Sequence, residues 1–196
     1  MEYNLNKSGY IEVICGPMYA GKTEELIRRI TRMDYAKREY IVFKPKIDNR
    51  YSESEISSHN LRKIKAINIE SADEIYKHLK DTTQAVVIDE VQFFKQNVID
   101  VCNDLAKRGL RVICAGLDLD FKGDPFGIMP LLLAYAEKVT KLTAICVCCG
   151  EEATRTQRII NDHPAYDSDP VVLVGAKESY EARCRKCHIV LHKDEK

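Results

Sequence analysis

The chain has 196 residues, a length that suits one domain of ordinary size with at most a small appendage and allows a substantial core. Lys and Arg together number 30, as do Asp and Glu, so no overall charge draws the chain toward nucleic acid or an anionic membrane surface. The polar first ten residues contain no apolar signal segment, and no apolar stretch is long enough to span a bilayer, so we expect a cytoplasmic protein that does not bind membranes.

Strands and helices are expected to alternate along the first 145 residues. Period-2 or continuous apolar runs predict strands at 9–15, 40–45, 62–69, 84–89, 110–116 and 139–145. Helical spacing, a Ser-x-x-Glu capping box at 71–74 and a stop at Gly109 predict helices at 23–33, 71–79, 97–109 and 130–138. This alternation predicts an α/β fold with a mostly parallel sheet flanked by helices, which binds ligands at the carboxyl ends of its strands.

The pattern changes after about residue 145, where cysteines and polar residues replace the alternating apolar runs. We therefore divide the chain into an ATP-binding α/β domain at 1–145 and a small C-terminal module at 146–196. A loop rich in Asp, Gly and Pro at 118–127 precedes this change.

Residues 16–23, "GPMYAGKT", match the P-loop pattern G-x-x-x-x-G-K-[ST] and lie between a predicted strand and a predicted helix. Glycines at both ends let backbone N–H groups turn toward phosphate oxygens, and the helix start adds its positive end. The lysine would contact the β- and γ-phosphates, and the threonine hydroxyl would serve Mg²⁺. The predicted phosphate-binding residues are Gly16, Pro17, Met18, Tyr19, Ala20, Gly21, Lys22 and Thr23.

Two adjacent acids, Asp89 and Glu90, follow the apolar strand "VVI". In P-loop proteins an acid at a strand end helps hold Mg²⁺, a role that suits Asp89. Glu90 is then free to accept a proton from a nucleophile. The residues alone leave open whether that nucleophile is water, as in an ATPase, or a substrate hydroxyl, as in a kinase.

Two C-x-x-C pairs, Cys146/Cys149 and Cys184/Cys187, predict a closed structural zinc site of four thiolates, since cytosolic thiols stay reduced. The gap between the pairs exceeds that of a zinc ribbon, so the chain between them must form a long loop pinned at its base by the metal. Cys148 is an alternative to Cys149 as a ligand. The segment "CRKCH" also fits a haem-attachment pattern, although a second C-x-x-C pair and the lack of an export signal argue against it.

Aromatic residues follow the strands that carry the acids, and two of them, Phe121 and Phe126, lie in the polar loop at 118–127. Planar side chains beside a phosphate site suit stacking on a nucleobase. Packing in the core is the alternative for any one of them.

Six blocks in order give the chain a resemblance to the type II thymidine kinases, the zinc-containing, cytosolic-type class. These blocks are "GYIEVICGPMYAGKT", "KPKIDNRY", "VVIDEVQFF", "GLDLDFKGDPFG", "LTAIC" and "CRKC". The resemblance implies a P-loop core with a lasso-like loop on a small zinc module, and transfer of the γ-phosphate of ATP to the 5′-hydroxyl of thymidine. It also implies Mg²⁺ with ATP, structural Zn²⁺, feedback inhibition by dTTP and a homotetramer.

The same resemblance assigns roles to individual residues. Glu90 is the base that accepts the 5′-hydroxyl proton, and Thr23, Asp48 and Asp89 serve Mg²⁺. The ATP-binding set gains Arg50, Asp89, Glu90, Val91 and Gln92. The nucleoside-binding set comprises Met18, Phe93, Leu117, Phe121, Phe126, Thr156 and Tyr180, with the backbone of Val171, Val172, Leu173 and Val174 at the base edge.

Two other functions compete with a nucleoside kinase. One is a nucleic-acid-dependent ATPase that grips DNA through the zinc module, although residues 175–196 carry only a weak excess of basic side chains. The other is a non-catalytic nucleotide-binding scaffold, against which the intact pair of acids argues.

Overall fold

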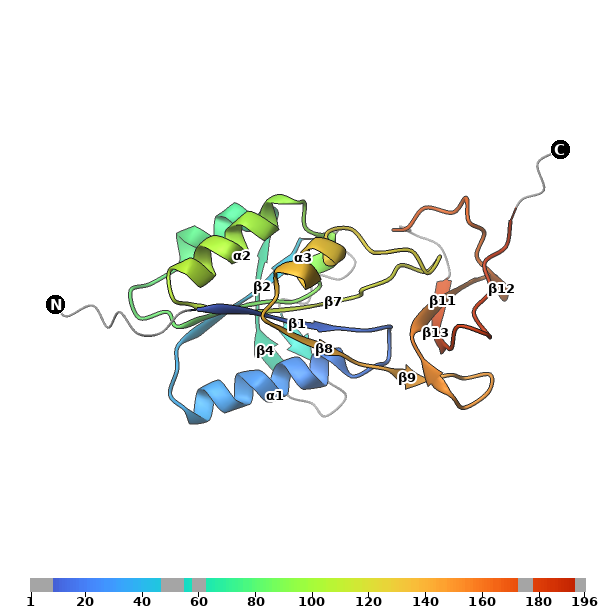
Figure 1. Cartoon of the computed structure of the whole chain (residues 1–196), viewed down its shortest axis with the longest axis horizontal. Coiled ribbons are helices and arrows are strands. Elements are labelled where there is room, and N and C mark those ends of the chain that lie inside the picture. The colour runs from blue at the N-terminus through green and yellow to red at the C-terminus, as the bar shows by residue number, and fades with distance from the viewer. Residues whose placement is uncertain (1–8, 47–54, 58–62, 173–177, 193–196) are drawn as a thin grey trace.

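A computed structural model describes residues 9–46, 55–57, 63–172 and 178–192. Within that part of the chain a six-stranded parallel sheet forms the centre, with strand order β5-β2-β6-β7-β1-β8 (Figure 1). Its strands are β1 (Tyr10–Cys15), β2 (Tyr40–Pro45), β5 (Ile67–Ile69), β6 (Ala85–Ile88), β7 (Arg111–Gly116) and β8 (Lys138–Lys141). The predicted α/β class with a parallel sheet is confirmed. Because β7 lies between β1 and β6, the P-loop and the two acids begin on strands that are not neighbours.

Helices cover both faces of this sheet (Figure 1). The helix after the P-loop, α1 (Lys22–Tyr35), lies on one face, and α2 (Asn97–Lys107) and α3 (Met129–Tyr135) lie on the other. Two 3₁₀ segments, η2 (Ala72–His78) and η3 (Val91–Phe93), complete the second face. Among the described residues, no helix is both long enough and apolar enough to cross a bilayer.

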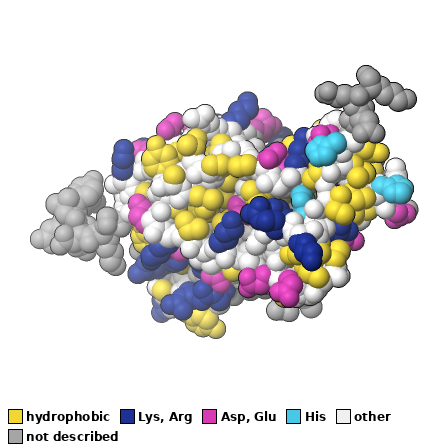
Figure 2. All heavy atoms as spheres, turned by 45° about the vertical axis from the view of Figure 1, so that its right-hand side comes forward, with side chains coloured by type: hydrophobic (Ala, Val, Ile, Leu, Met, Phe, Trp, Pro, Cys, Tyr) yellow, Lys and Arg dark blue, Asp and Glu magenta, His cyan; other side chains and the backbone are white. Residues whose placement is uncertain are grey.

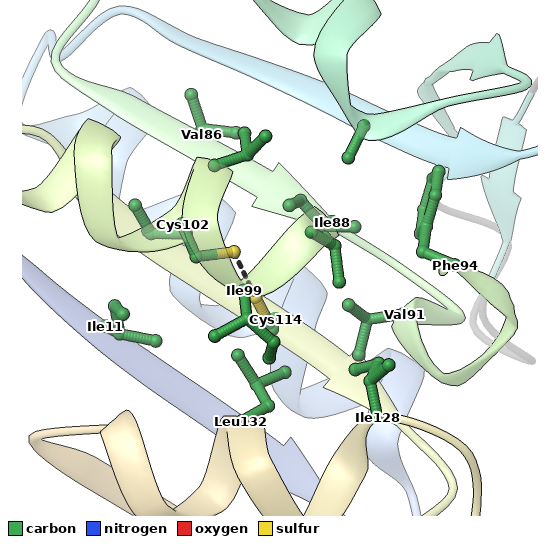
Figure 3. Close-up of a cluster of buried hydrophobic side chains, with 14 of the residues drawn as sticks. Ile11, Val86, Ile88, Val91, Phe94, Ile99, Cys102, Cys114, Ile128 and Leu132 are labelled. Carbon is green, nitrogen blue, oxygen red and sulfur yellow. Dashed lines mark hydrogen bonds between the residues drawn. The ribbon is translucent and has the colours of Figure 1, made fainter. Parts of the chain in front are cut away.

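Successive side chains of a strand point to opposite faces of the sheet, so they enter two different apolar clusters. In β6, Val86 and Ile88 belong to the apolar cluster under α2 and α3, whereas Ala85 and Val87 belong to the cluster under α1. Figure 3 shows the first cluster, in which Cys102 of α2 and Cys114 of β7 face each other with their sulfur atoms 3.8 Å apart. Both thiols are fully buried, so these cysteines act as small apolar residues of the core.

The C-terminal region is built from short antiparallel strands. A two-stranded sheet joins β9 (Ala144–Ile145) to β10 (Glu152–Ala153), and a three-stranded sheet has the order β12-β11-β13. The strands of the second sheet are β11 (Arg155–Ile160), β12 (His163–Pro164) and β13 (Glu178–Arg183). The domain boundary after residue 145 stays a prediction, and β9 pairs with the strand that follows it.

Three predicted elements differ from the structure. The strand expected at 62–69 is two short strands, because β4 (Lys63–Lys65) pairs with β3 (Glu55–Ser57) while β5 joins the central sheet. The strand expected at 139–145 likewise divides between β8 and β9, which lie in different sheets. The helix expected at 130–138 ends at Tyr135, since Lys138 pairs with Glu12 at the start of β8.

One buried charge cluster lies under α1. The Glu12 carboxylate on β1 accepts hydrogen bonds from Arg29 of α1 and, at 2.6 Å, from Nε of Arg111 of β7. Burial raises the pKa of Glu12, but the hydrogen bond and charge of Arg111 and the charge of Arg29 outweigh burial and hold the pKa below its ordinary value. The cluster therefore joins α1 to two central strands.

We expect Glu12→Gln to lower the free energy of unfolding by about 3 kcal/mol, because it removes the buried acid shared by Arg29 and Arg111 and leaves Arg29 with Glu25 as its acid partner. Urea denaturation at pH 7 measures this loss. In the wild type, the stabilisation from ionised Glu12 is fully present above the ordinary pKa of a glutamate. It is lost as the pH falls through the lower pKa that Glu12 has in the folded protein. Glu70→Gln removes the acid of an exposed ion pair and is the control, with a change of about 1 kcal/mol or less. Equal losses in the two variants would contradict the role of the cluster.

Candidate active site

The P-loop connects β1 to α1, and both of its glycines adopt backbone angles that other residues avoid. Gly16 has φ +143°, and a Cβ there would lie 2.4 Å from the carbonyl oxygen of Leu142. Gly21 has φ +80° and precedes the first residue of α1. The chain therefore needs glycine at both ends of the turn, as a backbone that wraps phosphate does.

Lys22 begins α1 and turns back toward the loop, where its ammonium group donates a hydrogen bond of 2.7 Å to the carbonyl oxygen of Pro17. Burial lowers the pKa of Lys22, while the charges of Glu90 and Asp89 act in the opposite direction. Both acids therefore lie within electrostatic reach of the P-loop lysine. Thr23 lies half-buried in the first turn of the same helix.

Asp89 and Glu90 follow β6 at its carboxyl end. Asp89 is buried, and its carboxylate lies 3.7 Å from the ammonium group of Lys44 on β2. Burial, together with the charge of Glu90, raises the pKa of Asp89 to about 7. A buried carboxylate next to a second, half-buried acid favours a bound cation, which would compensate their charge.

Glu90 has a left-handed backbone, with φ 52°, an unusual conformation for a residue other than glycine. Its side chain accepts a hydrogen bond of 2.6 Å from the amide nitrogen of Gln92. The amide oxygen of the buried Gln92 in turn accepts one of 3.2 Å from the backbone N–H of Leu117, after β7. Gln92, predicted as an ATP-binding residue, thus fixes the Glu90 carboxylate against the neighbouring strand. Val91 next to it is fully buried in the core.

The raised pKa of Asp89 predicts a pH dependence of stability in magnesium-free buffer. The folded state binds the proton of the Asp89 carboxyl group more tightly than the unfolded chain does. Protonated Asp89 therefore stabilises the fold fully below the ordinary aspartate pKa, and this stabilisation is lost as the pH rises through about 7. We expect Asp89→Asn to raise the melting temperature more at pH 8 than at pH 5.5. Thermal melts of both proteins across this range measure the difference, and an equal shift at both pH values would contradict the raised pKa.

Two aromatic residues predicted for the nucleoside pocket touch each other. The rings of Phe93 and Phe126 lie with their centroids 5.4 Å apart at an interplanar angle of 82°. Phe121, from the same loop as Phe126, is buried beneath the guanidinium group of Arg158. Leu117 lies half-buried where β7 enters this loop.

The C-terminal region contacts the P-loop directly. The buried hydroxyl group of Thr156 on β11 accepts a hydrogen bond of 3.0 Å from the backbone N–H of Met18. Tyr180 on β13 lies beside Arg158, whose Nε donates to its hydroxyl oxygen at 3.2 Å. The two strands, β11 and β13, pair along six residues, so Thr156 and Tyr180 belong to one sheet at the mouth of the P-loop.

The four cysteines of the two C-x-x-C pairs converge. The sulfur atoms of Cys146, Cys149, Cys184 and Cys187 all lie within 4.8 Å of one another, and those of Cys149 and Cys184 are 3.6 Å apart. A tetrahedral ion with bonds of about 2.3 Å to sulfur needs sulfur atoms about 3.8 Å apart, so the donor set fits a structural metal. Cys148 is exposed and lies outside this cluster, and the alternative that it replaces Cys149 is not favoured.

A sequence model of the thymidine kinase family matches residues 9–188. This chain belongs to the thymidine kinase family. Members of the family are ATP-dependent phosphotransferases, and the resemblance inferred from six sequence blocks is confirmed, together with the P-loop-type fold.

Two solved structures are similar to parts of this chain. The Legionella pneumophila ATPase DotB is 16% identical over 65% of this chain, with a TM-score of 0.40, and the chain spans about a third (34%) of that protein. The second structure is the genome packaging NTPase B204 from Sulfolobus turreted icosahedral virus 2 in complex with sulfate. It is 21% identical over 71% of this chain and 75% of the viral protein, with a TM-score of 0.43.

Four residues predicted for the sites, Asp48, Arg50, Leu173 and Val174, lie outside the described residues. The Tyr19 side chain is 65% exposed, whereas Ala20 is half-buried and packs against the cluster of Ala144, Cys146, Ala153 and Ala182. Val171 is half-buried and Val172 is exposed. Among the rest, the structure brings Lys22 near the two acids, Phe93 near Phe126, and Thr156 near Met18.

Several contacts were missed from the sequence. Lys44 pairs with Asp89, the ammonium group of Lys141 lies 2.8 Å from the buried Asp118 carboxylate, and His188 contacts the carbonyl oxygen of Phe121 at 2.8 Å. His188 therefore ties the cysteine segment to the loop at 118–127. Lys44 and His188 stand in quoted sequence blocks, but no block indicates which residue they contact, because each partner is more than 20 residues away along the chain.

Proposed function

We propose that this member of the thymidine kinase family transfers the γ-phosphate of ATP to the 5′-hydroxyl of thymidine, and to that of deoxyuridine, giving the nucleoside monophosphate and ADP for nucleotide salvage. The observation that carries the proposal is the Glu90 carboxylate, held by Gln92 at the carboxyl end of β6 within electrostatic reach of the P-loop lysine. An ATPase that activates water needs no pocket for a nucleoside, whereas the aromatic residues near this edge of the sheet suit a nucleobase.

ATP would be held mainly by the P-loop. Backbone N–H groups of residues 16–23 would cradle the phosphates, and Lys22 would exchange its hydrogen bond to Pro17 for a β- or γ-phosphate oxygen. Arg50 and residues 89–92 complete the proposed ATP set. Mg²⁺ bound to ATP, held by Thr23, Asp48 and Asp89, supplies charge neutralisation on the phosphates.

In the proposed reaction the 5′-oxygen of thymidine forms a bond to the γ-phosphorus as the bond from that phosphorus to the β,γ-bridging oxygen breaks. ADP leaves with the bridging oxygen, and the hydroxyl proton passes to the Glu90 carboxylate. The hydrogen bond from Gln92 keeps this carboxylate at one position while the proton moves. Lys22 would stabilise the negative charge on the transferred group.

The nucleoside would lie between the loop at 118–127 and the β11–β13 sheet. Met18 and Leu117 would bound the pocket near the P-loop, Phe93, Phe121 and Phe126 would enclose the ring, and Thr156 and Tyr180 would contact the base and sugar. The backbone of residues 171–174 would bond the base edge. Rejection of cytosine would then come from mispaired buried polar groups, which cost a great deal of binding energy.

We further propose that the four-cysteine cluster holds Zn²⁺ and that the chain assembles as a cytoplasmic homotetramer inhibited by dTTP. Thiolates in two C-x-x-C pairs at mutual distances within 4.8 Å are the donor set that zinc prefers in structural sites. Bound zinc supplies a cross-link between residues 146–149 and 184–187.

A coupled assay of ADP release with a panel of nucleosides tests the proposed function. We expect turnover that depends on thymidine or deoxyuridine and is low with water as the only acceptor. Turnover that ignores every nucleoside would refute it. Single-stranded DNA serves as a further arm, and we expect no stimulation, since basic side chains on the face shown in Figure 2 are interspersed with acidic and apolar ones.

A further inference from the structure

Arg158 is a buried cation on β11, with only 2% of its surface exposed. Its guanidinium group donates a hydrogen bond of 2.6 Å to the carbonyl oxygen of Pro170 and another to the carbonyl oxygen of Val171. Its Nε donates to the Tyr180 hydroxyl. The planar fork of arginine suits this pattern, because it offers several N–H donors in fixed directions.

The same guanidinium group lies over two aromatic rings. Its central carbon is 4.1 Å from the ring centroid of Phe121 and 5.5 Å from that of Tyr180. Both distances are within the range of cation–π attraction, which is stronger in places removed from water. Arg158 thus joins the loop at 118–127, residues 170–171 and β13.

The two carbonyl contacts also fix the neighbouring amide groups. A trans peptide unit is planar, and its N–H points opposite to its C=O. With the carbonyl oxygens of Pro170 and Val171 turned to Arg158, the N–H groups of Val171 and Val172 must point away from the guanidinium group. Two successive donors are thereby held in one direction at the start of the segment proposed to bond the base.

We propose that Arg158 is a positioning residue that sets nucleobase specificity by orienting the N–H groups of Val171 and Val172. These donors suit a ring carbonyl oxygen, which thymine and uracil present where cytosine carries an amino group. Cytosine would place donor against donor, a mismatch that a rigid site rejects strongly and a loose one tolerates. This inference rests on the proposed function, since it concerns the same nucleoside site.

Arg158→Lys tests the inference, because lysine keeps the charge but loses the planar fork. We expect KM for thymidine to rise about 10- to 100-fold, the effect of losing a hydrogen bond made by a charged group, while KM for ATP changes less than about twofold. The ratio of kcat/KM for thymidine to that for deoxycytidine should fall. Arg108→Lys, at an exposed arginine that follows α2 and pairs with Asp104, is the matched control and should leave all these values unchanged.

A second measurement needs no turnover. Hydrogen exchange of peptides covering residues 165–172 should be faster in Arg158→Lys than in the wild type, with exchange in α1 and β6 unchanged. If the lysine variant does not fold, Arg158→Gln is measured in its place, with the same expected pattern.

The outcomes distinguish a failure of the proposed kinase function from a failure of the specificity role of Arg158. A wild type that does not turn over with thymidine would overturn the proposed function and with it the specificity role, even if hydrogen exchange shows that Arg158 holds residues 170–172. With an active wild type, unchanged exchange, or an equal loss in KM for ATP and for thymidine with an unchanged nucleoside ratio, would overturn the role of Arg158 alone.

Discussion

Replacing Glu90 with Gln is expected to lower kcat for thymidine phosphorylation by about 10²- to 10⁴-fold, the usual contribution of a positioned general base. Glutamine keeps the length of the side chain and an oxygen that can accept the hydrogen bond from Gln92. It cannot take the proton of the attacking hydroxyl. The loss should therefore fall on kcat, with the affinities for ATP and thymidine nearly unchanged.

Steady-state kinetics together with calorimetric titration of each ligand measure this split. Glu39→Gln is the control, because Glu39 is an exposed acid in the turn before β2 and lies outside the proposed site. A Glu90→Gln enzyme with undiminished kcat would show that another group accepts the proton.

Replacing Cys184 with Ser is expected to abolish zinc binding and to disrupt the C-terminal region. Apparent binding energies of structural zinc in small domains are about 10–16 kcal/mol, larger than most single side-chain contacts. The cluster joins the loop between β9 and β10 to the end of β13. Since β13 pairs with β11, loss of the metal should also shift Thr156 away from Met18 and raise KM for thymidine.

Metal analysis of the purified protein and its melting temperature measure these effects. Cys148→Ser is a closely matched control, because Cys148 is an exposed thiol between the two cysteines of the first pair and lies outside the cluster. We expect one zinc ion per chain in the wild type and in Cys148→Ser, and much less than one in Cys184→Ser. Full zinc content in Cys184→Ser, or its loss in Cys148→Ser, would contradict the proposed ligand set.

The P-loop and the pair of acids could be predicted because each is a local pattern with a local cause. The glycines at 16 and 21 are required by the backbone angles of the turn itself. The acids directly follow an apolar run that the sheet must bury. The convergence of two C-x-x-C pairs could likewise be predicted, since four thiols in this pattern are the usual ligand set of a structural zinc site.

The divided strands could not be predicted, because periodicity indicates a strand but not its partner. Residues 63–65 and 67–69 read as one strand of alternating polar and apolar residues, yet they pair in different sheets. The contacts made by Gln92 and Arg158 were missed for a similar reason. Each depends on backbone groups that folding brings close, from 12 to 25 residues away along the chain, and a polar residue within a strand or turn gives no sign of that partner.

The most direct test of the account is the fate of the γ-phosphate when the protein is given labelled ATP and thymidine. The account predicts that the label appears in thymidine 5′-monophosphate in a one-to-one ratio with ADP, and that 5′-deoxythymidine, which lacks the accepting hydroxyl, receives none. Label released as inorganic phosphate at the same rate with and without thymidine would contradict it.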